Sequence, residues 1–183
     1  LKDKVAVITE RSMAGELDFS QSLRERVALL AGLKETTLKV VYEKKVKLNP
    51  GAKELVAACQ AKGVKIGLIS GGFTYFTNRL KQELGLDYAI ANTLEVVNGR
   101  LTGMVKGDII DAQAKADWLL KLRGELGLRP DQVFATGDGA NDLKMLAAAG
   151  VGIAYHAKPV VRHQAHVALS YSGLDGVINL FAD

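Results

Sequence analysis

The chain has 183 residues, of which 48% are hydrophobic, and this composition is sufficient for a buried core and excludes a disordered protein. Its 24 basic and 20 acidic residues give a net charge of +4, but the basic residues are scattered among few aromatics, which argues against a nucleic-acid partner. The single cysteine, Cys59, excludes an internal disulfide and favours a reducing, cytoplasmic setting, and no apolar run approaches the ~20 residues of a membrane span.

Residues 1–48 show helical periodicity and no strand pattern of any length. Apolar residues recur at three- and four-residue spacing, as at Leu23, Val27 and Leu30, so we expect a small helical domain here. The chain begins at Leu1, without Met and in the middle of an amphipathic pattern. We therefore expect these residues to belong to a longer chain.

From residue 49 onwards, helical patterns alternate with short apolar runs. The expected helices are 53–62, 74–84, 112–125 and 143–149, with a further helix opened by Pro159. The expected strands are 64–69, 88–92, 94–97, 100–105, 132–136 and 151–155. Asn98-Gly99 predicts a tight hairpin between two of these strands. The alternation predicts an α/β domain over residues 49–183, with a parallel sheet covered on both faces.

The segment 137–142, Gly-Asp-Gly-Ala-Asn-Asp, lies at a strand-to-helix turn, where open α/β sheets place their sites. Its glycines allow a tight bend and close approach of a ligand. Carboxylates there would repel a bare phosphate, so we expect Mg²⁺ between them. A dinucleotide fingerprint fits poorly, because Asp142 takes the place of the third glycine and no acidic residue follows about 20 positions later. A purely structural turn is the other alternative.

Two further elements favour a phosphate site. Ser70-Gly71-Gly72 follows the expected strand 64–69, and a hydroxyl with consecutive glycine amides can hold phosphate oxygens. Alone it would more simply be a tight turn, but its place at the end of a second parallel strand favours a site. Lys115 lies near the start of the helix 112–125 among alanines, where its amine has room to reach a phosphate. A solvated surface lysine is the alternative.

The chain resembles the haloacid dehalogenase superfamily of phosphotransferases in three motifs. Motifs two, three and four of that superfamily are similar, in this order, to Ser70-Gly71-Gly72, Lys115 and the segment 137–142. The stretches 16–27, 84–89 and 152–159 narrow the resemblance to the phosphoserine phosphatases. The resemblance implies a three-layer Rossmann-like core over residues 49–183 and part of a helical cap over residues 1–48. It also implies Mg²⁺-dependent hydrolysis of the small molecule O-phospho-L-serine to L-serine and phosphate, the last step of serine biosynthesis. A homodimer is left open.

The resemblance also assigns roles to individual residues. It makes Asp138 a magnesium ligand and places Asn141 near the phosphate. Ser70 and Gly71 would hold phosphate or substrate oxygens, supported by Gly72. Lys115 would neutralise charge on the phosphoryl group and the nucleophile. Asp142 would orient the metal site or Lys115.

Arg26 is the residue on which the expected substrate depends. On a helix it lies three residues after Leu23 and four before Leu30, on the apolar face, where a charge needs a partner. A structural ion pair or a snorkelling side chain would meet that need. The resemblance instead places the substrate carboxylate on Arg26, with Met13 and Phe19 as the apolar wall of the same pocket. Ordinary core packing is the alternative for those two residues.

One element of the resemblance is missing. The superfamily's first motif, Asp-x-Asp-x-Thr, supplies the nucleophile and the general acid on the central strand, and it occurs nowhere in residues 1–183. A glutamate near the substrate amino group is expected upstream as well. We therefore expect the core to lack its central strand, between strands 64–69 and 132–136, and the chain alone to be inactive. The alternatives are a related enzyme with another small phosphorylated substrate and a non-catalytic phosphate-binding fragment.

Overall fold

The computed structural model describes residues 2–181, which divide into two compact units. The first comprises the residues up to 47 together with 70–80 and 89–111, and the second comprises 48–69, 81–88 and the residues from 112 onwards. The boundary expected after residue 48 lies within one residue of a point where the chain passes from one unit to the other, and as a domain boundary it stays a prediction.

The first unit contains the expected helices and most of a three-stranded sheet, whose residues 67–69 and 88 belong to the second unit. Its helices are α1 (Lys2–Met13), α2 (Phe19–Ala28) and α3 (Thr36–Lys45), joined by the start of α5 (Thr74–Leu84). The sheet has the order β1-β2-β3, with β1 at Gly67–Phe73, β2 at Tyr88–Val97 and β3 at Arg100–Lys106. A capping box starts α2: Asp18 accepts from the Gln21 backbone N–H at 2.7 Å, and the Gln21 side chain accepts from the Asp18 N–H at 2.9 Å.

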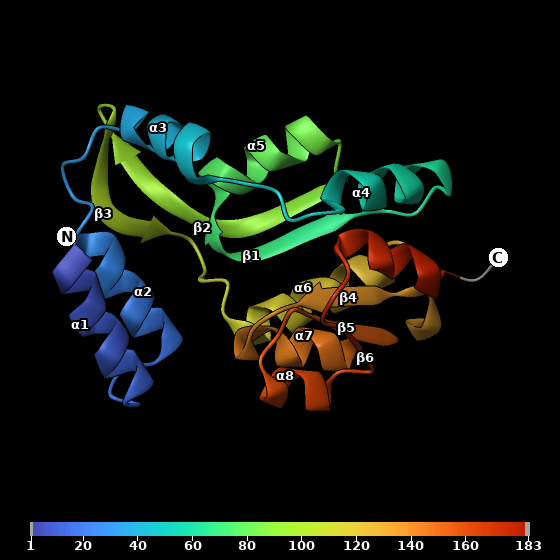
Figure 1. The fold of residues 1–183 in the computed structure, drawn as a ribbon. Helices are drawn as coiled ribbons and strands as arrows, with labels where there is room; N and C mark the ends of the chain where they lie inside the picture. The colour runs from blue at the N-terminus through green and yellow to red at the C-terminus, as the bar shows by residue number, and fades with distance from the viewer. Residues whose placement is uncertain (1, 182–183) are drawn as a thin grey trace. The chain divides into compact units, whose positions relative to one another are not determined.

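The hairpin predicted at Asn98-Gly99 is confirmed. Asn98 and Gly99 have φ angles of 50° and 70°, and β2 and β3 pair antiparallel on either side of them (Figure 1). The two strands expected at 88–92 and 94–97 form one strand, whose register shifts between Leu94 and Val96. The buried core of this unit comes from α2, α3 and the hairpin: Leu23, Val27, Leu38, Leu94, Leu101 and Val105.

The second unit has the alternating pattern that the sequence predicts. Its helices are α4 (Ala52–Ala61), the end of α5, α6 (Ala112–Glu125), α7 (Leu143–Ala148) and α8 (Pro159–Gln164). The strands β4 (Phe134–Gly137), β5 (Val151–Tyr155) and β6 (Val167–Leu169) lie side by side in that order, all parallel (Figure 1). Single 3₁₀ segments lie at Pro130–Gln132 (η1), Ala140–Asp142 (η2) and Leu174–Leu180 (η3). The core includes Leu119, Ala135, Leu146, Ala154 and Val161. The predicted α/β class with a parallel sheet is thus confirmed.

One expected strand is displaced. Strand β1 covers Gly67–Phe73 and not 64–69, so the Ser70-Gly71-Gly72 segment is the end of a strand, and the tight-turn alternative there is wrong. Ile66 explains the later start, because its carbonyl accepts from the N–H groups of Asp87 and Tyr88 and its own N–H donates to the Asp87 carboxylate. Both the carbonyl and the N–H of Ile66 are therefore already hydrogen-bonded where the strand begins at Gly67. Strands β1 and β4 belong to different sheets of the described chain.

Between residues 2 and 181, none of the helices combines the length and the apolar character that crossing a membrane requires.

Candidate functional site

The second unit buries an ion pair between Lys115 and Asp142. The ammonium of Lys115, in the first turn of α6, lies 2.7 Å from Oδ1 of Asp142, and the two side chains are only 7% and 9% exposed. The surface alternative for Lys115 is therefore wrong. Its neighbours on α6 are the alanines that the sequence analysis identified, and Ala116 is itself buried. A buried lysine needs a carboxylate this close, because an unpaired charge in the interior is far more costly than a paired one.

The second oxygen of Asp142 organises the turn that carries it. Its Oδ2 accepts hydrogen bonds from the backbone N–H groups of Asp138 at 3.1 Å and Gly139 at 3.2 Å. Gly137 has to be a glycine at this point, because a Cβ there would lie 2.5 Å from the Cβ of Asp142. The carboxylate of Asp142 thus holds both Lys115 and the start of the segment 137–142. Both of its oxygens take part in these contacts, through which Asp142 orients its neighbours.

Asp138 and Asn141 differ from Asp142 in being exposed. Within residues 2–181, the Asp138 carboxylate makes no hydrogen bond or ion pair, although its backbone N–H is bound by Asp142. In the same range, no three His, Cys, Asp or Glu side chains are grouped to hold a metal. One unpaired carboxylate nevertheless fits Mg²⁺, which proteins often hold through one or two carboxylates and several waters. Asp138 presents one such carboxylate.

The Ser70-Gly71-Gly72 segment belongs to the first unit and is held by a side chain that the sequence analysis did not single out. The backbone N–H of Gly72 donates to Ser70 Oγ at 2.9 Å. The amide of Asn92, in β2, donates to the carbonyl oxygens of Gly71 at 2.9 Å and Gly72 at 3.2 Å. The segment is therefore fixed from both sides of its backbone.

Arg26 lies on the half-buried side of α2, as its spacing predicts, whereas Arg24 is exposed. Its Nε donates to the Ser22 carbonyl at 3.2 Å, one turn back on the same helix. The ion pairs of the described chain do not include Arg26, so the structural ion pair considered above is wrong. The terminal nitrogens of this guanidinium are left with donors for a ligand.

Phe19 and Met13 have different surroundings. Phe19 packs against the core of the first unit, and its ring would lie 3.1 Å from a Cβ placed on Gly71, so it contacts the Ser70-Gly71-Gly72 segment. Met13, the last residue of α1, is 83% exposed, and core packing is therefore wrong for it. Within each unit the structure brings expected residues together: Phe19 with Ser70-Gly71-Gly72 in the first, and Lys115 with the segment 137–142 in the second.

Comparisons with known proteins point to the same superfamily. The family model for haloacid dehalogenase-like hydrolases matches residues 3–147. A phosphoserine phosphatase of Polaromonas sp. is 50% identical over 98% of this chain and 78% of its own length. The chain belongs to the haloacid dehalogenase-like hydrolases.

Solved structures of phosphoserine phosphatases are similar to this chain in fold. The unliganded probable phosphoserine phosphatase of Vibrio cholerae superimposes with a TM-score of 0.91 and 52% identity over 96% of this chain. A substrate-bound phosphoserine phosphatase complex gives a TM-score of 0.87 and 36% identity over 97% of this chain. The chain spans 84% of the second structure but 54% of the first.

In this haloacid dehalogenase-like chain, Asn92 is the residue that sequence reasoning missed. It ends one of the expected strands and carries no recognisable motif, and its partners lie about twenty residues away. The only signal available was an asparagine in an otherwise apolar strand, where a buried amide needs hydrogen bonds.

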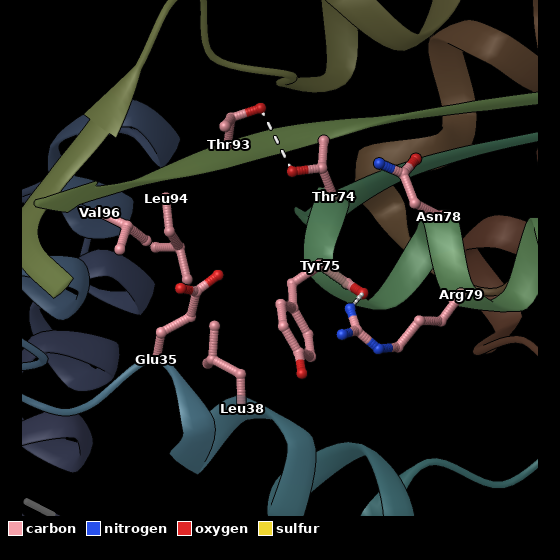
Figure 2. Close-up of a pocket in the computed structure, with 9 residues that line it drawn as sticks. All are labelled: Glu35, Leu38, Thr74, Tyr75, Asn78, Arg79, Thr93, Leu94 and Val96. Carbon is pink, nitrogen blue, oxygen red and sulfur yellow. Dashed lines mark hydrogen bonds between the residues drawn. The ribbon is translucent and has the colours of Figure 1, made fainter. Parts of the chain in front are cut away.

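The first unit also has a pocket of about 320 Å³, and Figure 2 shows the residues that line it. Its lining residues are Glu35, Leu38, Thr74, Tyr75, Asn78, Arg79, Thr93, Leu94 and Val96. The guanidinium of Arg79 lies 3.4 Å from the centre of the Tyr75 ring and donates to the Tyr75 carbonyl at 2.8 Å. None of these lining residues belongs to the expected site residues.

Proposed function

We propose that this chain forms the cap and core of a Mg²⁺-dependent phosphoserine phosphatase, which hydrolyses O-phospho-L-serine to L-serine and phosphate in the cytoplasm. The observation that carries the proposal is the buried pair of Lys115 and Asp142, which joins α6 to the segment 137–142. The names and identities of the relatives support the choice of substrate.

Lys115 would neutralise charge on the phosphoryl group. Transfer of a phosphoryl group depends mainly on alignment and on stabilising negative charge, and a fixed ammonium supplies both. Asp142 holds the amine at 2.7 Å, and burial of the pair keeps water from screening it. Ser70 and Gly71 would hold other phosphate or substrate oxygens, with Asn141 near the same group.

Asp138 would hold the magnesium ion, because its carboxylate is exposed and unpaired within the described residues. When bound, the ion would offset the charge of the phosphate. The carboxylate nucleophile is expected on an Asp-x-Asp-x-Thr strand outside residues 1–183. It would attack phosphorus, a nearby acid would give the departing serine oxygen its proton, and water would then cleave the aspartyl-phosphate.

Arg26 would select the substrate by binding its carboxylate through the free nitrogens of the guanidinium. Phe19 and Met13 would form the apolar wall beside it. A planar guanidinium can bind a carboxylate through two parallel hydrogen bonds, which a lysine cannot reproduce. Phosphate esters without a carboxylate would lose this contact.

The test is phosphate release by the full-length protein from O-phospho-L-serine, phosphohomoserine and sugar phosphates. We expect phosphoserine to be preferred in wild type, and Arg26→Lys to lower its kcat/KM by about tenfold or more. Arg24→Lys is the matched control, since Arg24 lies exposed on the same helix. A wild-type preference for a sugar phosphate would overturn the proposed substrate, and equal effects of the two variants would overturn the role of Arg26.

A further inference from the structure

Asn92 is a fully buried polar residue whose side chain makes three hydrogen bonds. Its exposed fraction is 0%, and its amide nitrogen donates to the carbonyls of Gly71 and Gly72. Its Oδ1 accepts from the backbone N–H of Ile110 at 2.7 Å. Both amide hydrogens and the amide oxygen are therefore used, and all the partners are backbone groups of the first unit.

These bonds fix one peptide unit at both ends. The peptide between Gly71 and Gly72 has its carbonyl held by Asn92 and its N–H held by Ser70 Oγ. Because a peptide is planar and its C=O and N–H point in opposite directions, holding the carbonyl sets the direction of the N–H. Glycines would otherwise leave this unit free to rotate.

The Ser70 hydroxyl ends the chain of hydrogen bonds that starts at the Asn92 amide and passes through the Gly71–Gly72 peptide. Its oxygen accepts from the Gly72 N–H, so its own hydrogen is available to donate to another acceptor. A hydroxyl already polarised as an acceptor is a better donor to an anion, since hydrogen bonds in a chain strengthen one another. Asn92 thus acts on the Ser70 hydroxyl through the intervening peptide, and it does not touch that hydroxyl directly.

The same side chain joins the segment to its surroundings. Ile110 follows β3, and its carbonyl would lie 3.7 Å from a Cβ on Gly71, next to the ring of Phe19. Asn92 binds the N–H of this same residue. The glycine segment, the Phe19 ring and the chain after β3 therefore meet around one buried amide.

We propose that Asn92 is a positioning residue, which orients the Ser70 hydroxyl toward the phosphate of the substrate. The proposal rests on the proposed function for the identity of that substrate. Asn92→Ala in the full-length protein is expected to lower kcat/KM for phosphoserine about 10- to 100-fold and to raise the inhibition constant of inorganic phosphate by a similar factor.

Thr93→Val is the matched control. Thr93 is the next residue of the same strand, and its hydroxyl accepts one hydrogen bond, from the Thr74 hydroxyl at 3.3 Å. Both variants are expected to lower the melting temperature, but Thr93→Val should leave kcat/KM and phosphate inhibition within about twofold of wild type. If Asn92→Ala does not fold, Asn92→Ser, which keeps a donor and removes fewer atoms, takes its place. Unchanged phosphate inhibition in a folded Asn92 variant would overturn the proposal.

Hydrogen exchange separates this inference from the proposed function. The Gly72 and Ile110 amides should exchange faster in the Asn92 variant than in Thr93→Val, whatever the substrate of the enzyme. If wild type hydrolyses no phosphoserine but these amides still exchange faster in the Asn92 variant, the proposed substrate is wrong and the positioning of Ser70 is supported. If wild type is active but neither amide responds, the positioning role is wrong.

Discussion

The ammonium of Lys115 and the carboxylate of Asp142 lie 2.7 Å apart, with less than a tenth of either side chain exposed. Their attraction joins the first turn of α6 to the segment after β4. The same carboxylate binds two backbone N–H groups of that segment. Stability and the expected chemistry therefore depend on one residue, Asp142, which is not expected to touch the substrate.

Asp142→Asn should leave a buried ammonium without its counter-charge. We expect the free energy of unfolding to fall by about 3–5 kcal/mol, measured by urea denaturation of the full-length protein. Asp131→Asn is the control, because Asp131 pairs with Arg129 at 3.0 Å on the surface and should hardly matter. A loss below about 1 kcal/mol for Asp142→Asn would mean that the pair is not buried in solution.

Two glycine substitutions should have opposite effects. Gly137→Ala would place a Cβ 2.5 Å from the Cβ of Asp142 and should destabilise the protein by about 1–3 kcal/mol. Gly124→Ala, in the last turn of α6, meets no atom within 4 Å and should stabilise by about 0.5 kcal/mol through helix propensity. Urea denaturation measures both. Equal effects of the two variants would contradict the described turn.

Gly71 and Phe19 should be energetically coupled. A Cβ on Gly71 would lie 3.1 Å from the end of the Phe19 ring, so Gly71→Ala should strain this contact. Phe19→Leu removes the end of the ring, and the double variant should lose less stability than the sum of the two single losses. A double-mutant cycle by urea denaturation gives the coupling. Additivity within about 0.5 kcal/mol would show that the residues do not touch.

Asp87 should make stability depend on pH. Its pKa is lowered from the ordinary value of 3.8, first because the Ile66 N–H binds the charged carboxylate and further because the Lys65 ammonium lies 2.9 Å away. The unfolded chain therefore binds the proton more readily. It follows that Asp87 stabilises the fold above its ordinary pKa and that this contribution is lost as the pH falls through the lowered value.

The variant Asp87→Asn tests that dependence. We expect the difference in urea midpoint between wild type and Asp87→Asn to be larger at about pH 7 than at about pH 3. Asp131→Asn again serves as control, because its pKa is also lowered by a basic partner but the pair is exposed. A difference for Asp87→Asn that is the same at both pH values would contradict the assigned hydrogen bonds.

The sequence predicts the elements whose signals are local. The helix 112–125 has the predicted bounds, and the hairpin at Asn98-Gly99 follows from two residues that tolerate positive φ. The alanines around Lys115 predict room for its amine to reach a phosphate; the side chain is buried, and its role stays a prediction. For the helix and the hairpin, local propensity was sufficient to predict the element.

Features set by distant partners were not predicted. The start of β1 depends on bonds between Ile66 and residues about twenty positions later, and the extended Ser70-Gly71-Gly72 segment depends on Asn92. Glycines have low strand propensity, so the sequence favours a turn there. The strand Val167–Leu169 was missed because three residues carry too little periodicity, although β5 pairs with it.

The most direct test of the proposed function is Mg²⁺-dependent phosphate release from O-phospho-L-serine. The 183-residue chain is compared with a protein that also carries the Asp-x-Asp-x-Thr strand. We predict that only the longer protein turns over, and that Asp138→Asn abolishes the response to Mg²⁺. Turnover by the 183-residue chain alone would contradict our placement of the nucleophile, and no turnover by either protein would contradict the proposed substrate.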